Sequence, residues 1–314
     1  MRYIDRDEVR RRLTYERCIP LVRQALISFS AGETKQHLRT ILPLSEGRLF
    51  GIMPGALGAH APFGAKLISV FHGNADRGIQ SHQGLVILFD PESGAPVCTV
   101  HAGEVTAIRT AAASAVATDA LARPDARRLA ILGSGEQAGT HARAISNVRS
   151  LESIAVWGRS AEKSVVFAKA LKEELDVPVM AMPSVKKAVA EADMICTVTS
   201  SPEPILLGEW VRPGTHINVV GSSHAGPAEI DNELVVRSRF IADSREGVIA
   251  QGGEFLRANA AGLVDDGHIV AEIGDVLSGK IEGRRNAREI TIYKSLGHVA
   301  QDLAAAWALY SEAE

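Results

Sequence analysis

A glycine-rich turn between a strand-like run and a helical pattern constrains this chain more than any other feature. The apolar run 129–132 leads into six residues of the form G-x-G-x-x-A, and a helical pattern follows. In that order, the first glycine permits a tight turn, the second lets a pyrophosphate approach the backbone, and the small third residue lets helix and strand pack closely. The helix N-terminus supplies N–H groups for phosphates. The sequence therefore predicts a nicotinamide dinucleotide site at Gly133, Ser134, Gly135, Glu136, Gln137 and Ala138.

The end of the next strand indicates which dinucleotide binds. NAD sites usually carry an acid there for the ribose 2′-hydroxyl, but this strand ends in Trp157, Gly158, Arg159 and Ser160. Arg159 can place a planar cationic fork against a 2′-phosphate, and Ser160 adds a hydroxyl. The alternative is an exposed turn arginine with no ligand. We expect NADPH to be preferred, with NADH as a second cofactor.

Bulk properties exclude several classes of protein. The 314 residues are 46% hydrophobic and 23% charged, with a net charge of −3, which gives no general electrostatic case for nucleic acid or an anionic membrane. No apolar run has transmembrane length, and the charged N-terminus lacks a signal-peptide core. The cysteines Cys18, Cys98 and Cys196 are widely spaced. We expect a cytoplasmic protein with reduced thiols and no metal site.

The chain shows two rhythms of secondary structure. A helical pattern at 15–30 precedes short strand-like runs split by turns, and a long Ala-rich helical pattern follows at 105–122. From residue 127, strands and helices alternate, which indicates a parallel sheet covered on both faces. The predicted fold is α/β: a Rossmann-type doubly wound sheet at 124–294, plus a discontinuous α+β substrate-binding and dimerisation domain at 1–123 and 295–314. The expected strands are 37–44, 48–54, 64–71, 84–90, 96–101, 129–132, 154–157, 177–181, 194–199, 216–221, 240–242 and 289–293.

Ligands of such sheets bind outside the carboxyl ends of the strands. We therefore expect one cofactor crevice along the ends of the strands at 129–132, 194–199 and 216–221. The residues expected to line it, besides the glycine-rich turn, are Thr197, Val198, Thr199, Val220 and Gly221.

Three cations stand in segments of low polarity. Lys66 lies in an apolar strand, Arg109 lies on a helix of small residues, and Arg39 interrupts a strand-like run. A buried cation is costly unless it is paired, so the three together indicate convergence on an anion, most simply a substrate carboxylate. The alternative is that each is an edge-strand or snorkelling side chain. His82, beside Ser81 at a strand start, could exchange protons at neutral pH or make a structural hydrogen bond.

Six segments of the chain resemble the ornithine cyclodeaminase/mu-crystallin family over nearly the whole length: GAKLISVF, RGIQSHQG, AGEVTAIRTAAASA, LGSGEQA, HINVVGSSHAGPAEID and IYKSLGHVAQD. The resemblance implies a homodimer, and a carboxylate held by Arg39, Lys66 and Arg109. It also implies a cofactor lined by Ser81, Arg109, Thr110, the turn at 134–138, Arg159, Thr197 and Ser295.

Departures from the family pattern favour one branch. Ornithine cyclodeaminases carry an acid–base aspartate where this chain has Ser223, a lysine near the place of Pro227, and an acid after the second strand where this chain has Arg159. A serine is a poor base without a helper. These departures and the Ser-His-Gln triplet at 81–83 resemble the ketimine reductase branch, which reduces Δ1-pyrroline-2-carboxylate or Δ1-piperideine-2-carboxylate to L-proline or L-pipecolate with NAD(P)H.

The resulting hypothesis is an oxidoreductase acting on C=N bonds in amino-acid metabolism. Lys66, or a water held by His82 or Ser223, would supply the proton, so Lys66, Arg109, Ser223 and His82 are the candidate catalytic residues. The alternatives, in order, are ornithine cyclodeaminase, alanine dehydrogenase and a non-catalytic mu-crystallin-like binding protein. We expect a small imino or amino acid as the substrate, and neither nucleic acid nor membrane as a partner.

Overall fold

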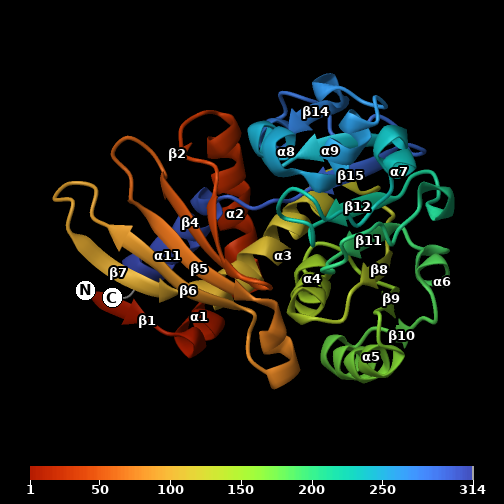
Figure 1. Cartoon of the computed structure of the whole chain (residues 1–314), viewed down its shortest axis with the longest axis horizontal. Helices are drawn as coiled ribbons and strands as arrows, with labels where there is room; N and C mark the ends of the chain where they lie inside the picture. The colour runs from red at the N-terminus through yellow and green to blue at the C-terminus, as the bar shows by residue number, and fades with distance from the viewer. Residues whose placement is uncertain (313–314) are drawn as a thin grey trace. The chain divides into compact units, whose positions relative to one another are not determined.

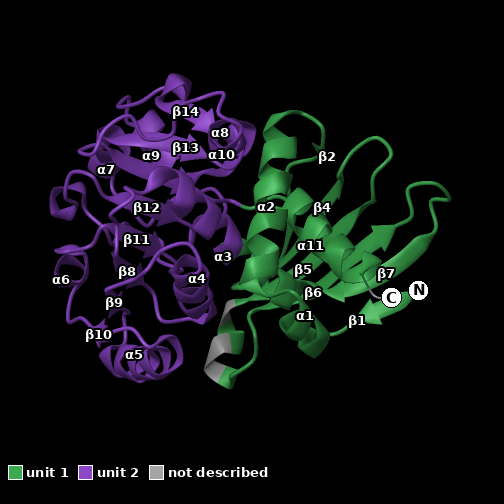
Figure 2. Cartoon of the chain, turned by 180° about the vertical axis from the view of Figure 1, so that it is seen from behind, with its two compact units in different colours: residues 1–110, 297–314 green, residues 111–296 purple. Residues whose placement is uncertain are grey.

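A computed structural model describes residues 1–312, apart from the side chains of His72, Ala75 and Asp76. The last two residues of the expected segment 295–314 thus lie outside the described residues. The chain divides into two compact units (Figure 2): unit 1 is Met1–Thr110 with Gly297–Glu314, and unit 2 is Ala111–Leu296. The division falls within helix α3 (Ala102–Leu121), so this helix contributes to both units. The roles expected for the two parts stay predictions.

Unit 1 contains a seven-stranded sheet of order β1-β7-β6-β5-β4-β2, with β3 also paired to β4. Its pairs are antiparallel except for β1, which runs parallel to β7. The three-residue strand β1 was not expected, because it is too short to show an alternating pattern. The strands are β1 (Arg2–Ile4), β2 (Lys35–Gln36), β3 (Thr40–Ser45), β4 (Arg48–Ala56), β5 (Phe63–Phe71), β6 (His82–Phe89) and β7 (Pro96–His101).

The helices of unit 1 are α1 (Arg6–Arg12), α2 (Tyr15–Ser30), the start of α3, α11 (Val299–Ser311) and the 3-10 turn η1 (His72–Arg77). Helix α11 packs against α2 and lies across β4, β5 and β6 (Figure 1). Arg109 of α3 donates to Asp302 and Gln301 of α11. The close approach to β4 depends on Gly55, since a Cβ there would lie 2.5 Å from Val299 Cγ1.

Unit 2 contains an eight-stranded, wholly parallel sheet of order β10-β9-β8-β11-β12-β15-β13-β14. The α/β fold class with a doubly wound parallel sheet is confirmed. The strand order reverses between β8 and β11, which is where such sheets bind their ligands. The strands are β8 (Arg128–Leu132), β9 (Ser153–Trp157), β10 (Val179–Ala181), β11 (Met194–Thr197), β12 (His216–Val219), β13 (Ser238–Ala242), β14 (Ile269–Glu272) and β15 (Ile290–Lys294).

Strand β14 and the short helices before and after it were not expected, since segments of four to eight residues give little periodicity. The helices of unit 2, besides α3, are α4 (Glu136–Ser146), α5 (Ala161–Leu175), α6 (Val185–Val189), α7 (Asn232–Arg237), α8 (Arg245–Gln251), α9 (Gly253–Ala260) and α10 (Ile273–Leu277), with 3-10 turns η2 (Gly208–Trp210) and η3 (Asp266–His268).

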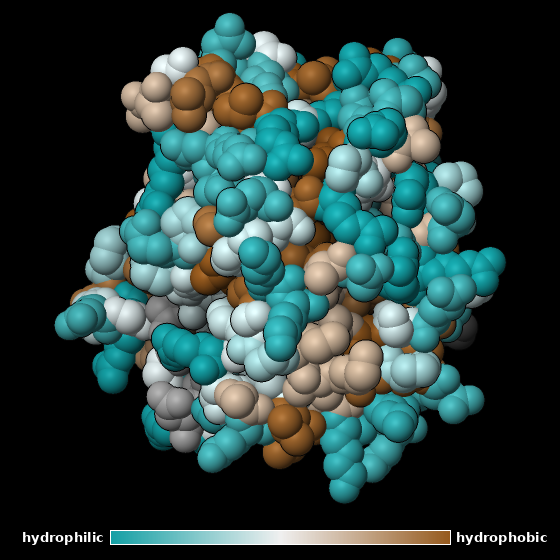
Figure 3. Space-filling view, turned by 90° about the vertical axis from the view of Figure 1, so that its right-hand side faces the viewer, coloured by the Kyte–Doolittle hydropathy of each residue, from teal (hydrophilic) through white to brown (hydrophobic). Residues whose placement is uncertain are grey.

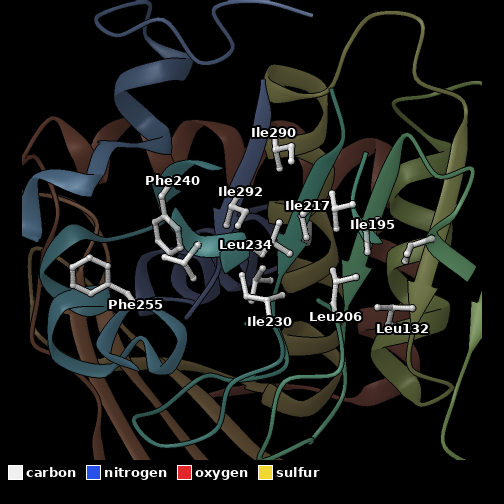
Figure 4. Packing of buried hydrophobic residues seen from close by; sticks show 14 of the residues in the cluster. Leu132, Ile195, Leu206, Ile217, Ile230, Leu234, Phe240, Phe255, Ile290 and Ile292 are labelled. Carbon is white, nitrogen blue, oxygen red and sulfur yellow. The ribbon is translucent and has the colours of Figure 1, made fainter. Parts of the chain in front are cut away.

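Unit 2 has two hydrophobic core clusters, and the one in Figure 4 lies between the sheet and helices such as α7 and α9. Branched aliphatic side chains such as Ile195, Ile217 and Ile292 come from neighbouring strands, and Leu234 and Phe255 come from helices. Branched side chains pack well on a sheet that is buried on both faces. This rigid sheet fixes the strand ends that carry the predicted cofactor residues.

The three cysteines are buried and free. Within residues 1–312, no helix is long and apolar enough to cross a membrane. Figure 3 shows mainly hydrophilic side chains on the α6 side of unit 2, with apolar groups between them.

Candidate active site

The glycine-rich turn takes the backbone conformation that its sequence requires. Gly133 has φ of +139°, which L side chains rarely adopt, and a Cβ there would lie 2.8 Å from the Val198 carbonyl oxygen. Gly135 caps the N-terminus of α4, and a Cβ on it would meet no atom within 4 Å. The fully buried Ala138 lets α4 pack on the sheet. The turn thus offers open space at Gly135, beside the N-terminus of a helix, and it fits a pyrophosphate.

The end of β9 lies beside this turn. A Cβ on Gly158 would lie 2.8 Å from Ser134 Oγ, so the two loops approach closely. Ser160 caps α5 by accepting from the Lys163 N–H at 3.3 Å. Arg159 is exposed and has no hydrogen bond or ion pair among the described residues. Its guanidinium is therefore available to a ligand phosphate.

The ends of β11 and β12 are joined by a buried carboxylate that we did not predict. Glu229 accepts hydrogen bonds from Thr197 Oγ1, Thr199 Oγ1 and Gly221 N, each at 2.7 Å, and from Thr199 N at 2.6 Å. Both threonine hydroxyls are thus engaged within the protein. The cofactor contacts predicted for Thr197, Val198, Thr199, Val220 and Gly221 stay predictions. Because the hydroxyls of Thr197 and Thr199 already bond to Glu229, these two residues would contact the cofactor through backbone or methyl groups.

A second buried cluster holds the segment before Ser223. Lys294 Nζ donates to the carbonyl and the hydroxyl of Ser222, both at 2.6 Å, and lies 2.7 Å from Glu254 Oε2. The Ser222 hydroxyl also donates to Glu254. Ser223 itself is half-buried. The buried Ser295 hydroxyl has no hydrogen-bond partner among the described residues, which leaves it for a ligand.

In unit 1, the structure brings the three predicted cations together around an acid. Lys66 Nζ lies 2.8 Å from Asp302 Oδ2, and Arg109 Nε donates to Asp302 Oδ1 at 3.0 Å. Arg109 Nη1 donates to Gln301 Oε1 at 2.8 Å. Strand β5, helix α3 and helix α11 thus each supply one member of a buried ion triad. The anion that we expected from the substrate is supplied in part by the protein.

Arg39 joins the same cluster through Gly297. Its Nη2 atom donates to the Gly297 carbonyl at 2.8 Å. Gly297 has φ of +74°, and a Cβ there would lie 2.5 Å from Arg109 Nη1. Glycine is required at this position because any other residue would displace the guanidinium of Arg109. Lys66 and Arg109 therefore share one carboxylate, and Arg39 lies near enough to act on the pKa of Lys66, so the cluster keeps a positive surplus.

Burial and charge change the acidity of this cluster. Burial, with a smaller contribution from Arg109 and against the opposing effect of Asp302, lowers the pKa of Lys66 to about 7. Burial acts to raise the pKa of Asp302, but Arg109 and Lys66 outweigh it and hold that pKa below its usual value. Burial, together with Arg109, lowers the pKa of His298 to about 3, so this histidine is neutral at physiological pH. Lys66 can therefore gain and lose a proton near pH 7.

Ser81 and His82 form a local pair at the start of β6, with Ser81 Oγ 2.9 Å from His82 Nδ1. Both are half-buried, as is Thr110. The catalytic part predicted for His82 and the cofactor contacts predicted for Ser81 and Thr110 stay predictions.

Asp302 and Gln301 were missed in the sequence, although a signal was present. Asp302 is an isolated charge on an Ala-rich helix, as Arg109 is. The argument that selected Arg109 would have selected it too. Glu229 lies in an irregular segment, and Glu254 lies in a helix that also contains other polar residues. Neither acid therefore stands out as a lone charge among apolar residues.

Comparison with known proteins decides the family. A model described as the ornithine cyclodeaminase/mu-crystallin family matches residues 3–314. The chain belongs to this family.

Family members with known names share much of the sequence. Ketimine reductase mu-crystallin of Mus musculus is 37% identical over 296 residues, covering 93% of this chain and 90% of the relative. Δ1-pyrroline-2-carboxylate reductase of Bacillus cereus (strain ZK / E33L) is 33% identical over 315 residues, covering 100% and 97%. The solved structure of Thermococcus litoralis Δ1-pyrroline-2-carboxylate reductase, in complex with NADH and L-proline, has a TM-score of 0.96 at 32% identity and covers 100% of this chain and 97% of that one.

Proposed function

We propose that this chain is a reductase of cyclic imino acids, converting Δ1-pyrroline-2-carboxylate or Δ1-piperideine-2-carboxylate to L-proline or L-pipecolate. The named family members of similar length support this proposal. The observation that carries it is the buried triad of Lys66, Asp302 and Arg109, joined by Arg39, since its surplus positive charge suits a small carboxylate.

Each cation has a separate part in holding the substrate. Nη2 of Arg109 makes no hydrogen bond to the described residues, so it is free to donate to a carboxylate while Nε and Nη1 are held by Asp302 and Gln301. Asp302 fixes both Arg109 and Lys66, so the site loses little side-chain entropy when the substrate binds. Arg39, which directly precedes β3, would supply the third cation for the carboxylate.

A reduced nicotinamide supplies the hydride for the imine carbon. The nitrogen must hold a proton as the hydride arrives, and Lys66, with its pKa of about 7, can supply one at neutral pH. A substrate that arrives as an iminium would place less demand on this lysine. His82 and Ser223, through a water, remain the other candidate donors.

The cofactor that we propose is NADPH in preference to NADH. The glycine-rich turn and the N-terminus of α4 would hold the pyrophosphate, and Ser295 would add a hydroxyl. The preference rests on Arg159, which is exposed, unpaired among the described residues and placed where an NAD site carries an acid.

We also propose a homodimer formed through the sheet of unit 1. The face opposite α11 carries apolar side chains in register, with Ile52 opposite Leu67 and Leu67 opposite Leu85. Leu42 is 56% exposed, Ile52 38% and Phe63 36%. An apolar sheet face of this kind marks an interaction surface. A second copy of the chain would cover it with its own equivalent face.

The test is NADPH oxidation with a panel of cyclic imino acids, with L-ornithine and with pyruvate plus ammonia assayed in parallel. Turnover of a cyclic imino acid alone supports the proposal. Ammonia and proline formed from ornithine would establish the cyclodeaminase instead. Oxidation that depends on pyruvate and ammonia would establish alanine dehydrogenase. Tight NADPH binding without turnover of any of these compounds would indicate a binding protein.

A further inference from the structure

Glu229 is a fully buried carboxylate with four hydrogen-bond donors and no ion-pair partner among the described residues. Oε1 accepts from the N–H and hydroxyl of Thr199, and Oε2 accepts from the N–H of Gly221 and the hydroxyl of Thr197. Each oxygen thus faces one backbone N–H group, which cannot reverse its direction. An amide would turn a hydrogen toward one of these N–H groups in either orientation, whereas a protonated acid can direct its hydrogen at a threonine hydroxyl instead. Burial raises the pKa of Glu229, and the four donors act against this by favouring the ionised carboxylate.

Glu254, the neighbouring acid, differs from Glu229 because Lys294 neutralises its charge. Glu254 lies 2.7 Å from Lys294 Nζ, and both side chains are fully buried. The Glu229 N–H donates to Glu254 Oε1 at 3.0 Å, so the two acids belong to one cluster. With Glu229 ionised, two negative charges and one positive charge give this cluster a net charge of −1, and the hydrogen bonds from Thr197, Thr199 and Gly221 stabilise the charge on Glu229.

This charge lies at a defined part of the sheet. Thr199 and Gly221 follow the carboxyl ends of β11 and β12, and a Cβ on Gly221 would lie 2.0 Å from the Thr199 carbonyl oxygen. In a doubly wound sheet the glycine-rich turn and the strand after it bind the adenosine half of a dinucleotide. The nicotinamide half then lies over the other half of the sheet, which begins with β11 and β12.

We propose that Glu229 supplies a fixed negative charge to the nicotinamide end of the cofactor site and so stabilises the oxidised ring relative to the reduced ring. The inference rests on the proposed function, since it needs a nicotinamide cofactor. The oxidised ring carries a positive charge and the reduced ring is neutral, so a nearby anion favours the oxidised ring. When hydride leaves the ring for the imine carbon, the ring becomes cationic, and the imine nitrogen takes up a proton. Glu229 thereby makes bound NADPH a stronger hydride donor.

The decisive measurement is the ratio of the dissociation constant of NADP⁺ to that of NADPH, obtained by titration without substrate. Glu229→Gln removes the charge and keeps the size, and we expect the ratio to rise about tenfold, the effect of a charge at several ångströms in a partly buried site. Glu229→Asp keeps the charge but disturbs the four hydrogen bonds. Thr197→Val removes one hydrogen bond and keeps the charge. Glu229→Asp and Thr197→Val can change both dissociation constants, but they should leave the ratio of the NADP⁺ constant to the NADPH constant unchanged.

An equal weakening of NADP⁺ and NADPH binding in Glu229→Gln would show that the residue acts only on loop geometry and would overturn the inference. Should Glu229→Gln not fold, the wild-type protein provides the test. NADP⁺, NADPH and 2′-phospho-ADP-ribose are then compared, the last of which lacks the ring. The inference requires that NADP⁺ gains at least as much affinity over 2′-phospho-ADP-ribose as NADPH does. A larger gain for NADPH contradicts it.

The same data separate this inference from the proposed function. A protein that binds neither NADPH nor NADH refutes the proposed function itself. A protein that reduces cyclic imino acids, but whose ratio is unaffected by Glu229→Gln, refutes only the part assigned to Glu229.

Discussion

The Lys66 ammonium and the Asp302 carboxylate lie 2.8 Å apart, and both side chains are buried. Lys66 comes from the sheet of unit 1 and Asp302 from a helix 236 residues later in the chain. Removing one partner of such a pair leaves a buried charge without compensation. The pair therefore determines both the fold of unit 1 and the charge of the candidate carboxylate site.

Replacing Lys66 by methionine tests the substrate site. The variant loses one cation and the candidate proton donor, while Asp302 keeps its bond to Arg109. We expect kcat/KM for a cyclic imino acid to fall by about 10²-fold or more, with the dissociation constant of NADPH unchanged. The matched control is Lys35→Met, at an exposed lysine of β2 in the same unit. Full activity in Lys66→Met would remove this residue from the site.

The pH dependence of turnover tests the protonation state of Lys66. Its pKa is lowered from 10.5 to about 7, so the cationic form predominates below pH 7 and is lost above it. We expect kcat/KM to fall about tenfold per pH unit above pH 7, because the cation binds the carboxylate and donates the proton. Lys66→Arg should lower turnover, because an arginine that stays protonated is a poor proton donor, and the turnover that is left should lose this limb, because the cation is kept. The same limb in both proteins would assign it to the substrate or another group.

Arg159→Ala tests the choice of cofactor. Loss of a charge-assisted contact with the 2′-phosphate should raise KM for NADPH about tenfold or more. KM for NADH should change little, because NADH lacks that phosphate. Arg127→Ala is the control, since Arg127 is exposed and lies at the amino end of β8, away from the carboxyl ends of the strands. A parallel rise for both cofactors in Arg159→Ala would contradict selection by this residue.

The proposed dimer is tested by charge on the apolar sheet face. Ile52→Glu places a carboxylate on β4 at a side chain that is already partly exposed, so the folded chain tolerates it, but a dimer would have to bury it. We expect light scattering coupled to size exclusion to give the dimer mass for the wild type and the monomer mass for Ile52→Glu. Val166→Glu, on the exposed side of α5, should keep the wild-type mass. Dimers of both variants would place the interface elsewhere.

His141 predicts how stability changes in acid. It is fully buried, with Nε2 2.9 Å from Ser114 Oγ and Nδ1 2.7 Å from the Gln137 carbonyl oxygen. Burial lowers its pKa from 6.5 to about 4. The unfolded chain therefore binds one more proton than the folded chain between these pH values. Stability is full above pH 6.5 and falls by up to about 1.4 kcal/mol per pH unit as the pH drops toward 4. Urea unfolding of His141→Gln should show a shallower slope across this window, and an unchanged slope would exclude His141 as its source.

The sequence predicted those parts of the fold that carry strong local signals. Helix α2 begins and ends at the expected residues 15 and 30, because it is long and amphipathic and its one proline, Pro20, does not end it. The region around 269–277 was not predicted, since β14 and α10 have four and five residues, too few for a period to appear. Tertiary pairing rather than local preference forms such elements.

The sequence predicted the cations of the candidate site but not its acids. Lys66 and Arg109 stand out as charges in apolar segments, and the structure brings them together with Arg39. Asp302 gives the same local signal, an isolated charge on an Ala-rich helix, but its partners Lys66 and Arg109 are long-range contacts that only the fold shows. Glu229 lies in a loop where acids are common, so its burial could be known only from the fold.

The place of α11 in the sequence has a consequence for folding, because this helix completes a unit whose first segment is Met1–Thr110. During synthesis the sheet of unit 1 is made first, yet Lys66 and Arg109 lack Asp302 until residues 111–296 have been translated. A chain truncated before residue 302 keeps these cations but lacks the carboxylate that offsets part of their charge. Unit 1 therefore reaches its final packing only after residue 302 has been added.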